Sequence, residues 1–246
     1  MERKELFRAL VGSHNYNLNT QESDYDYKVF IAPTFDDLYF NKQYSKSTIG
    51  EEQDLDIHDV RKVSNLWWKA NVNFLEVLFS KEIMIGLEVK EETVKLIEQM
   101  LAMKHDIAKM NVSYLYNACI GMSITKMKLT LKGTEGTRRL VDKFGYDSKN
   151  AMHTIRILDF LQRFADTNFE DFEYAIRYEN SDSFKAFLFE VKDGKYTYEQ
   201  VESFITDMRK VVEHEYKERY MNMKPNEETN QKLIEIVKQI VKNELE

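Results

Sequence analysis

Two short stretches near the start of the chain decide the fold: Val-Gly-Ser-His-Asn-Tyr-Asn-Leu at residues 11–18 and Ser-Asp-Tyr-Asp at residues 23–26. In the first stretch, Gly12 allows the backbone to approach a ligand closely, and Ser13 can cap a helix that starts there. Backbone N–H groups at the start of a helix attract phosphate. The first stretch therefore predicts a phosphate-binding turn.

The second stretch opens a predicted strand over residues 24–32, in which charged and apolar side chains alternate until Pro33. Asp24 and Asp26 lie two residues apart, so both carboxylates leave the same face of that strand. Two such carboxylates repel one another unless a cation lies between them, and oxygen-only ligands favour Mg²⁺ or Mn²⁺. A phosphate-binding turn beside paired aspartates is the arrangement that phosphoryl or nucleotidyl transfer requires.

A third carboxylate is expected on a neighbouring strand, because it would complete the metal site and help to deprotonate an attacking hydroxyl. Asp54 and Asp56 are both candidates, since they lie on one face of a predicted strand over residues 52–57. Strand geometry alone does not separate these two residues. A second interpretation is that the acidic run starting at Glu51 is a surface loop with no role in the chemistry.

The rest of the chain changes from mixed strands and helices to helices alone. A further strand is predicted over residues 6–11, helical spacing of apolar residues begins near residue 60, and from about residue 90 nearly all of the pattern is helical. We therefore predict an α+β protein, with a small mixed sheet and flanking helices over residues 1–88 and an all-helical portion over residues 89–246.

Composition excludes several classes of protein. The 246 residues include 8 Gly and 2 Pro, whereas average usage gives about 17 and about 12. Collagen-like, Pro-rich disordered and many-turned all-β folds are excluded on that ground, because each needs these residues in quantity. The single Cys119 excludes an internal disulfide framework and a Cys-based zinc finger. With no apolar run near the roughly 18 residues of a membrane span and no signal-peptide core, a cytoplasmic protein without membrane association is expected.

Charge is unevenly distributed along the chain. The net charge of −7 argues against binding long nucleic acids, but residues 126–163 carry nine Lys or Arg and four acids. Within them Lys149, His153 and Arg156 are spaced i, i+4 and i+7, so they share one helix face. That face can bind a triphosphate, since Arg donates two parallel hydrogen bonds to phosphate oxygens and Lys acts as a point charge. The alternative is a solvated basic stripe whose exposed cations contribute little to folding.

These residues resemble the predicted nucleotidyltransferase family of the DNA polymerase β superfamily that is sometimes associated with RNA repair. The matching motifs are Gly12-Ser13-x-x-Tyr16, Ser23-Asp24-x-Asp26, Asp54 before Val60-Arg61-Lys62, Asn71-x-Asn73-x-Leu75-Glu76-x-Leu78, Tyr146-Asp147-x-Lys149-x-Ala151-x-His153-x-x-Arg156, and Gly194 near Tyr198-Glu199. The chain departs from the family at Asn17, where Gly is usual, and at Val72, where Pro is usual. Asn tolerates positive φ, so the turn is expected to survive. A helix cap at Asn71 and a buried structural carboxylate at Glu76 explain those two matches.

The resemblance implies a polymerase-β-like catalytic palm over residues 1–88, a helical domain over residues 89–246, and a two-metal site for Mg²⁺ or Mn²⁺. It implies an enzyme that moves a nucleoside monophosphate from an NTP such as ATP to a hydroxyl of an RNA end, a protein or a small molecule, with release of pyrophosphate. The implied catalytic and metal-binding residues are Asp24, Asp26 and Asp54, with Asp56 as the fallback for the third. The implied nucleotide-binding residues are Gly12, Ser13, Lys149, His153 and Arg156. The alternative is a non-catalytic nucleotide-binding or antitoxin-like partner-binding module, which three intact carboxylates disfavour.

Overall fold

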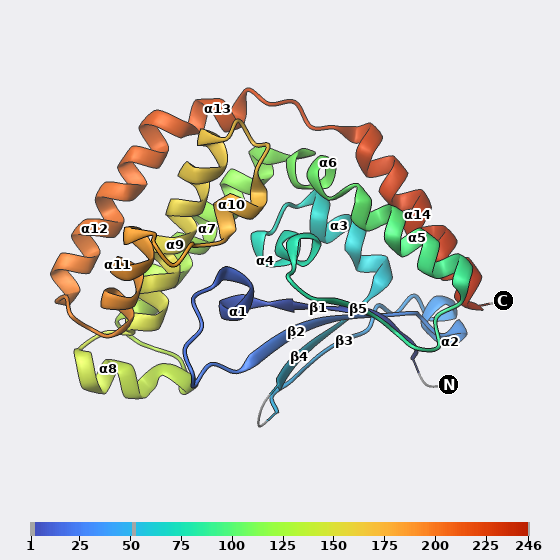
Figure 1. Cartoon of the computed structure of the whole chain (residues 1–246), viewed down its shortest axis with the longest axis horizontal. Helices are drawn as coiled ribbons and strands as arrows, with labels where there is room; N and C mark the ends of the chain where they lie inside the picture. Colours follow the sequence, from blue (N-terminus) through green and yellow to red (C-terminus); the bar gives the residue numbers. More distant parts are fainter. Residues whose placement is uncertain (1–2, 51–52, 246) are drawn as a thin grey trace. The chain divides into compact units, whose positions relative to one another are not determined.

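A computed structural model describes residues 3–50 and 53–245 of the chain, which divides into two compact units (Figure 1). The first unit comprises the described residues of Met1–Asn111 and Pro225–Glu246, and the second comprises Val112–Lys224. The division into a catalytic domain over residues 1–88 and a helical domain over residues 89–246 stays a prediction.

The first unit is built on a mixed five-stranded sheet with the strand order β3-β4-β2-β1-β5. Its strands are β1 (Glu5–Val11), β2 (Tyr25–Ile31), β3 (Ser45–Thr48), β4 (Gln53–Asp59) and β5 (Ile83–Ile85). β2 and β4 are parallel, whereas the other neighbouring pairs are antiparallel. The predicted α+β fold with a small mixed sheet is therefore confirmed, and β1, β2 and β4 are the three strands expected from the sequence.

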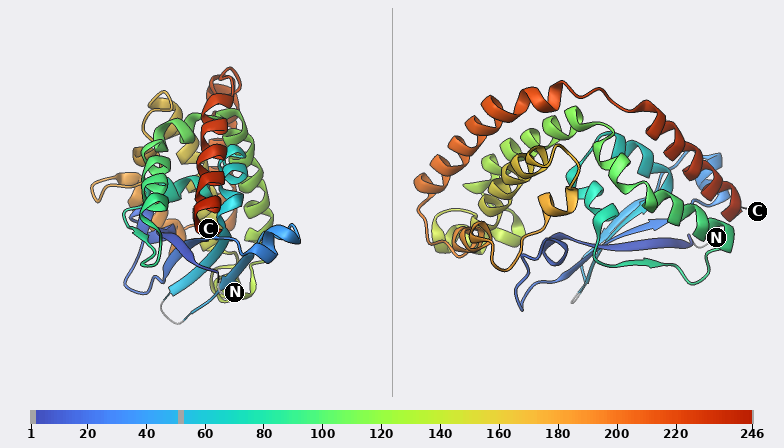
Figure 2. Two further views of the ribbon diagram at one scale, coloured as in Figure 1. Left: turned by 90° about the vertical axis from the view of Figure 1, so that its right-hand side faces the viewer. Right: turned by 45° about the horizontal axis from the view of Figure 1, so that its top comes forward.

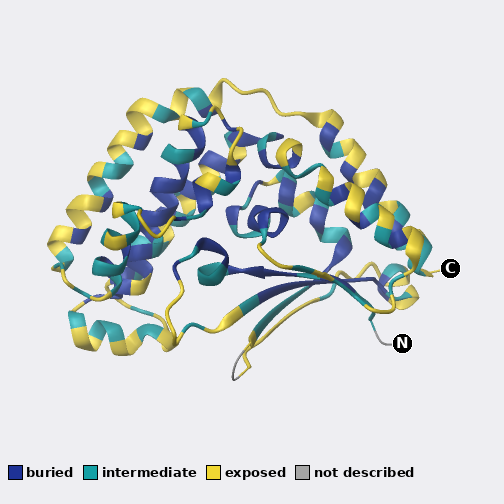
Figure 3. Cartoon of the chain, in the orientation of Figure 1, coloured by how far each residue is buried: buried dark blue, intermediate teal, exposed yellow. Residues whose placement is uncertain are grey.

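Alternation along β2 assigns its side chains to two different surroundings. On one face, the ring of Phe30 stacks on Phe7 with centroids 4.7 Å apart. On the other face, Leu10, Tyr27, Val29 and Ile31 form a buried cluster. The strand is exposed at Tyr25, partly exposed at Asp26 and buried from residue 27 onward, as the colours of Figure 3 show. The two aspartates of the Ser-Asp-Tyr-Asp stretch thus lie where β2 enters the core.

The helices of the first unit follow the predicted change in spacing near residue 60. They are α1 (Gly12–Tyr16), α2 (Phe35–Tyr39), η1 (Val60–Lys62), α3 (Val63–Trp68), α4 (Val72–Leu75), η2 (Glu76–Phe79), α5 (Glu91–Ala102), α6 (Lys104–Lys109) and α14 (Glu227–Leu245). Asn71 caps α4 by accepting the backbone N–H of Asn73 at 3.0 Å, as expected. Helix α14 packs along α5 and also contacts α3 and η1. Helices α3, α4, α5, α6 and α14 lie on one side of the sheet (Figures 1 and 2).

The second unit is helical throughout. Its elements are α7 (Val112–Thr130), η3 (Glu135–Thr137), α8 (Arg138–Phe144), α9 (Ser148–Asp166), α10 (Phe172–Ile176), α11 (Ser183–Lys192), α12 (Tyr198–Val211), η4 (Val212–Tyr216) and α13 (Lys217–Met221). Helix α9 is central, because α7, α8, α10, α11, α12 and η4 all pack against it. Most of its side chains are consequently buried.

Across the described residues, no helix combines the length and the apolar character that crossing a membrane would demand.

Candidate functional site

Asp26 and Asp54 of the first unit lie at the end of the sheet where β2 and β4 begin. Because these two strands are parallel, their first residues lie at the same end, and the register sets Asp26 beside Asp54. Paired residues of neighbouring strands point to the same face, so these two carboxylates are neighbours. Asp24 precedes β2 directly and is exposed, whereas Asp26 and Asp54 are partly exposed. Over residues 3–50 and 53–245, no group of three or more His, Cys, Asp or Glu side chains is arranged to hold a metal ion.

The acidic run is a strand and not a surface loop. Its first residues, Glu51 and Glu52, lie outside the described part of the chain, but from Gln53 onward the backbone pairs with β2, and from Leu55 onward it also pairs with β3. The surface-loop interpretation of Asp54 and Asp56 is therefore wrong. Asp54 pairs with β2 alone, whereas Asp56 has a paired strand on each side.

Gly12 brings the end of β1 against Asp26. Val11 is the register partner of Asp26, and Gly12 follows it with a positive φ of 70°. A Cβ atom at Gly12 would lie 2.5 Å from Asp26 Oδ2, so any other residue there would displace that carboxylate, in addition to the strain of the positive φ. The turn closes at Asn17, whose φ of 61° confirms that asparagine supplies the left-handed conformation there.

The start of α1 is held by Glu76 and not by a cap at Ser13. The helix begins at Gly12, so Ser13 is its second residue, and the N-cap position is Val11 with no side-chain cap. The expectation that Ser13 caps this helix is therefore wrong. The buried carboxylate of Glu76 accepts the N–H of Gly12 at 3.0 Å and the hydroxyl of Tyr16 at 2.5 Å. Glu76 is thus the buried structural carboxylate that the sequence analysis expected.

The two candidates for the third carboxylate have different surroundings. Asp56 Oδ2 lies 2.7 Å from Lys28 Nζ and 2.9 Å from His58 Nε2, and Asp56 Oδ1 accepts a hydrogen bond from Ser47 at 2.9 Å. Partial burial raises the pKa of Asp56, but hydrogen bonds from His58 and Lys28 outweigh that effect and hold the pKa well below its usual value. Asp54 instead accepts the backbone N–H of Gly50 at 3.2 Å.

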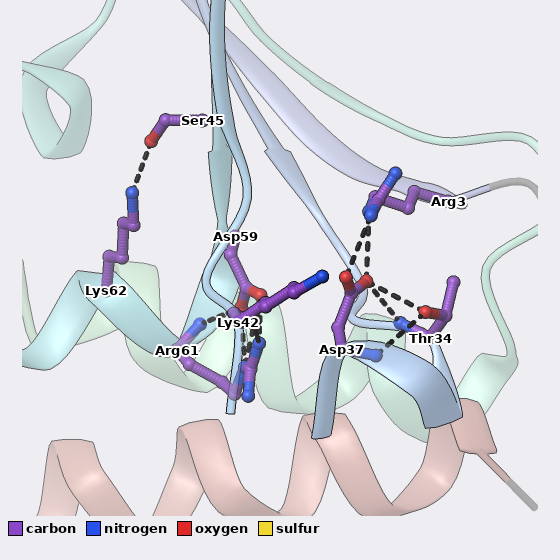
Figure 4. A network of polar contacts seen from close by, with 8 residues as sticks. All are labelled: Arg3, Thr34, Asp37, Lys42, Ser45, Asp59, Arg61 and Lys62. Carbon is purple, nitrogen blue, oxygen red and sulfur yellow. Dashed lines mark hydrogen bonds and ion pairs between the residues drawn. The ribbon is translucent and has the colours of Figure 1, made fainter. Parts of the chain in front are cut away.

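The Arg-Lys pair that follows β4 makes structural contacts at the other end of that strand (Figure 4). Arg61 forms a close ion pair with the fully buried carboxylate of Asp59, with Nη2 and Oδ2 2.5 Å apart, and also donates to the carbonyl of Lys42. Lys62 donates to the hydroxyl of Ser45 on β3. These bonds anchor the edge of the sheet.

A second ion pair in Figure 4, between the partly exposed Arg3 and the buried Asp37, holds the first described residues of the chain. Arg3 donates two hydrogen bonds, of 2.9 and 2.8 Å, to Asp37. Asp37 and Thr34 form the capping box at the N-terminus of α2. The carboxylate of Asp37 therefore both caps the start of this helix and binds Arg3. The arginine bonds to Asp37 hold the pKa of that carboxyl well below its usual value.

The predicted phosphate-gripping residues lie on α9 in the second unit, but they do not form a solvated stripe. Lys149 is exposed, His153 is half-buried and Arg156 is buried at 3% exposure. The expectation that Arg156 is an exposed cation is therefore wrong, because helices pack around α9 on nearly every side. Burial, and then the positive charge of Arg156, lower the pKa of His153 well below its usual value, so the ring is neutral at pH 7.

Two further lysines belong to these surroundings and were not identified from the sequence. Lys126 of α7 lies with Nζ 3.4 Å from the side-chain oxygen of Asn150, one residue beyond Lys149. Lys192, at the end of α11, adds its positive charge to the environment of His153. Lys126 begins the basic segment noted above, which is a signal that could have found it. Lys192 lies outside that segment.

Comparison with known protein families matches residues 2–232 to the RNA repair pathway DNA polymerase beta family. Among solved structures, a nucleotidyltransferase-like protein from Exiguobacterium sibiricum 255-15 is similar at 10% sequence identity and a TM-score of 0.29, over 98% of this chain and 70% of that one. The search of curated proteins found no match to this sequence.

Proposed function

The chain belongs to the RNA repair pathway DNA polymerase beta family, and from that premise we propose that it transfers a nucleoside monophosphate from an NTP to a hydroxyl and releases pyrophosphate. The observation that carries the proposal is the register of the two parallel strands, which sets Asp26 beside Asp54. Gly12 supports it further, since its missing side chain leaves room for the carboxylate of Asp26.

The donor set suits Mg²⁺ or Mn²⁺, because carboxylate oxygens are the ligands that hard divalent cations prefer. Asp24, Asp26 and Asp54 are the residues that we propose to hold two such ions. When bound, the metal would neutralise negative charge on the phosphates and on the attacking oxygen. Asp54 would in addition accept the proton of the attacking hydroxyl.

We assign the third carboxylate to Asp54 in preference to Asp56. The ammonium group of Lys28 already pairs with Asp56 at 2.7 Å, and Ser47 donates a hydrogen bond to its other oxygen. A cation would have to compete with an existing ammonium ion for Asp56. The neighbour of Asp54 across the sheet is instead another carboxylate, Asp26, and a metal relieves the repulsion between such a pair.

In the first unit, Gly12 and Ser13 are the residues that we propose to bind phosphates of the nucleotide. In the second unit, taken by itself, Lys149, His153 and Arg156 are the residues that we propose to bind a nucleotide. The acceptor that we propose is the hydroxyl of an RNA end, since the family is described by its RNA repair pathway. A net charge of −7 suits a short RNA end better than long, sequence-independent nucleic-acid binding.

The test is a transfer assay on the whole chain. Each of the four NTPs, labelled at the α-phosphate, is incubated with Mg²⁺ and a short RNA that ends in a free 3′-hydroxyl, and both labelled RNA and pyrophosphate are measured. The same RNA with a blocked 3′ end tests the acceptor, and total protein or a small-molecule fraction replaces it in parallel reactions. We expect label on the free RNA end only.

Matched variants give the assay its controls. Asp26→Asn is expected to abolish transfer, whereas Asp36→Asn removes the same charge from an exposed position on α2 and is expected to leave it unchanged. Nucleotide binding without pyrophosphate release, for every NTP and every acceptor, would overturn the proposed reaction in favour of a non-catalytic nucleotide-binding module. Label on protein would keep the reaction and overturn the RNA acceptor.

A further inference from the structure

Three helices of the second unit bring cationic side chains to the first turns of α9. Lys126 comes from α7, Lys149 and Arg156 from α9, and Lys192 from the last position of α11. Hydrogen bonds fix these helices to one another at this point. Lys126 Nζ lies 3.4 Å from Asn150 Oδ1, and the Ser148 hydroxyl donates to the backbone carbonyl of Lys192 at 2.7 Å.

Positive charges predominate around His153. Beyond burial, the leading effects on His153 come from the positive charges of Arg156, Lys126, Lys149 and Lys192, in that order. Lys126 itself is partly buried, and burial followed by the charge of Arg156 lowers its pKa. Bringing like charges together in a partly desolvated place costs free energy in the folded protein. A bound anion of several charges would offset that cost.

Two acids interact with these cations, and the oxygens of both already have partners. Asp147 is fully buried and is the N-cap of α9, where its carboxylate accepts the backbone N–H and the side-chain N–H of Asn150 at 2.9 and 2.7 Å. Asp159 accepts the hydroxyl of Tyr178 at 2.7 Å and lies 3.8 Å from Arg163. Two carboxylates leave the four cations with a net positive charge.

We propose that Lys126 and Lys192 join Lys149 and Arg156 in a polyphosphate-binding site on the second unit, which takes a di- or triphosphate and discriminates against a monophosphate. The inference rests on the proposed function in one respect: the polyphosphate is that of the NTP or of the pyrophosphate product. Four cations match the three to four charges of such a group, with Arg donating a fork of N–H groups and each Lys acting as a point charge. The neutral ring of His153 adds an uncharged hydrogen-bonding group at the centre.

The experiment titrates inorganic pyrophosphate into the full chain by calorimetry, with EDTA present so that no divalent ion links pyrophosphate to the carboxylates of the first unit. Orthophosphate is titrated in parallel. The wild-type chain is expected to bind pyrophosphate clearly more tightly than orthophosphate. Lys126→Gln and Lys192→Gln are each expected to weaken pyrophosphate binding by about tenfold, or about 1.4 kcal/mol. Lys128→Gln removes the same charge from an exposed position on α7 and is expected to change binding less than twofold.

The melting temperature of each variant without ligand shows whether that variant is folded. Lys126→Arg keeps the positive charge and is therefore expected to keep pyrophosphate binding. No pyrophosphate binding by the wild-type chain, or unchanged affinity in both Gln variants, would overturn this site. An equal loss in Lys128→Gln would also overturn it, since binding would then depend only on overall charge. Pyrophosphate binding that depends on Lys126 and Lys192 in a chain without transfer activity would uphold the site and refute the proposed reaction. Transfer activity in the wild-type chain, together with unchanged pyrophosphate affinity in Lys126→Gln and Lys192→Gln, would support the proposed reaction and refute the polyphosphate site.

Discussion

Replacement of Gly12 by alanine tests the close approach of backbone to carboxylate on which the site is built. The φ of 70° at this position is strained for any L-residue with a side chain, which costs about 1–2 kcal/mol. In addition, the new Cβ would lie 2.5 Å from Asp26 Oδ2, so the carboxylate has to move by about 0.9 Å to restore an ordinary contact of 3.4 Å. A displacement of about 1 Å at reacting groups lowers a rate by about 100-fold.

Gly145 provides the matched control for this prediction. Its φ is 82°, but a Cβ atom there would meet nothing within 4 Å. Both alanine variants are therefore expected to lower the melting temperature, by roughly 2–4 °C for each kcal/mol lost. Only Gly12→Ala is expected to lower kcat in the transfer assay, by about 100-fold. Turnover of Gly12→Ala within threefold of that of Gly145→Ala would refute the reasoning, because backbone strain alone would then explain the glycine.

Three further predictions follow from the carboxylates. Asp24→Asn and Asp26→Asn are each expected to abolish transfer while the metal-free chain melts at the same or a higher temperature, because one of two repelling charges is gone; metal-dependent turnover in either variant would remove that residue from the mechanism. Asp54→Ala is expected to lower the transfer rate far more than Asp56→Ala. In urea unfolding, Asp56→Ala is expected to lose more free energy of unfolding, by roughly 1–3 kcal/mol, because it leaves the buried ammonium ion of Lys28 without its carboxylate. A larger loss of transfer in Asp56→Ala would mean that the assignment of the third carboxylate is wrong by two residues. Burial raises the pKa of Asp159 to about 6, above an unfolded value of about 3.9. The contribution of Asp159 to stability is therefore complete below about pH 4 and is lost as the pH rises through 6. Asp159→Asn is expected to make the free energy of unfolding in urea depend less on pH over that range, and an unchanged slope against pH would contradict the prediction.

The sequence predicts the strands that enter the core and misses those at the edges of the sheet. β2 begins with alternating charged and apolar residues, whose side chains point to opposite faces of the sheet, and that alternation is visible in the chain. β3 is Ser-Lys-Ser-Thr and exposed throughout, so it has no apolar pattern, and β5 is Ile-Met-Ile, which is too short to show a period. Their pairing comes from the neighbouring strands, which sequence periodicity does not report.

In the candidate site too, the sequence predicts local features and misses those that depend on distant parts of the chain. The sequence predicts one strand for Asp24 and Asp26, but β2 begins at Tyr25, so Asp26 lies in the strand and Asp24 directly before it. The difference between Asp54 and Asp56 is not local, because it arises from Lys28 on the neighbouring strand, which the register sets opposite Asp56. The burial of Arg156 likewise depends on helices that come from elsewhere in the chain, although the spacing on α9 correctly indicates a shared face.

The return of α14 to the first unit has a consequence for how the protein is made. The chain leaves this unit after Asn111 and re-enters it at Pro225, and the backbone N–H of Asn226 donates to the carbonyl of Met110 at 2.7 Å. The second unit is therefore an insertion whose two ends are pinned side by side in its host. During synthesis the inserted unit is complete before its host, since the ribosome delivers residues 225–245 after residues 112–224. The unit that carries the aspartates therefore receives α14, and with it the packing of α14 on α5 and α3, only after the whole insertion has been synthesised.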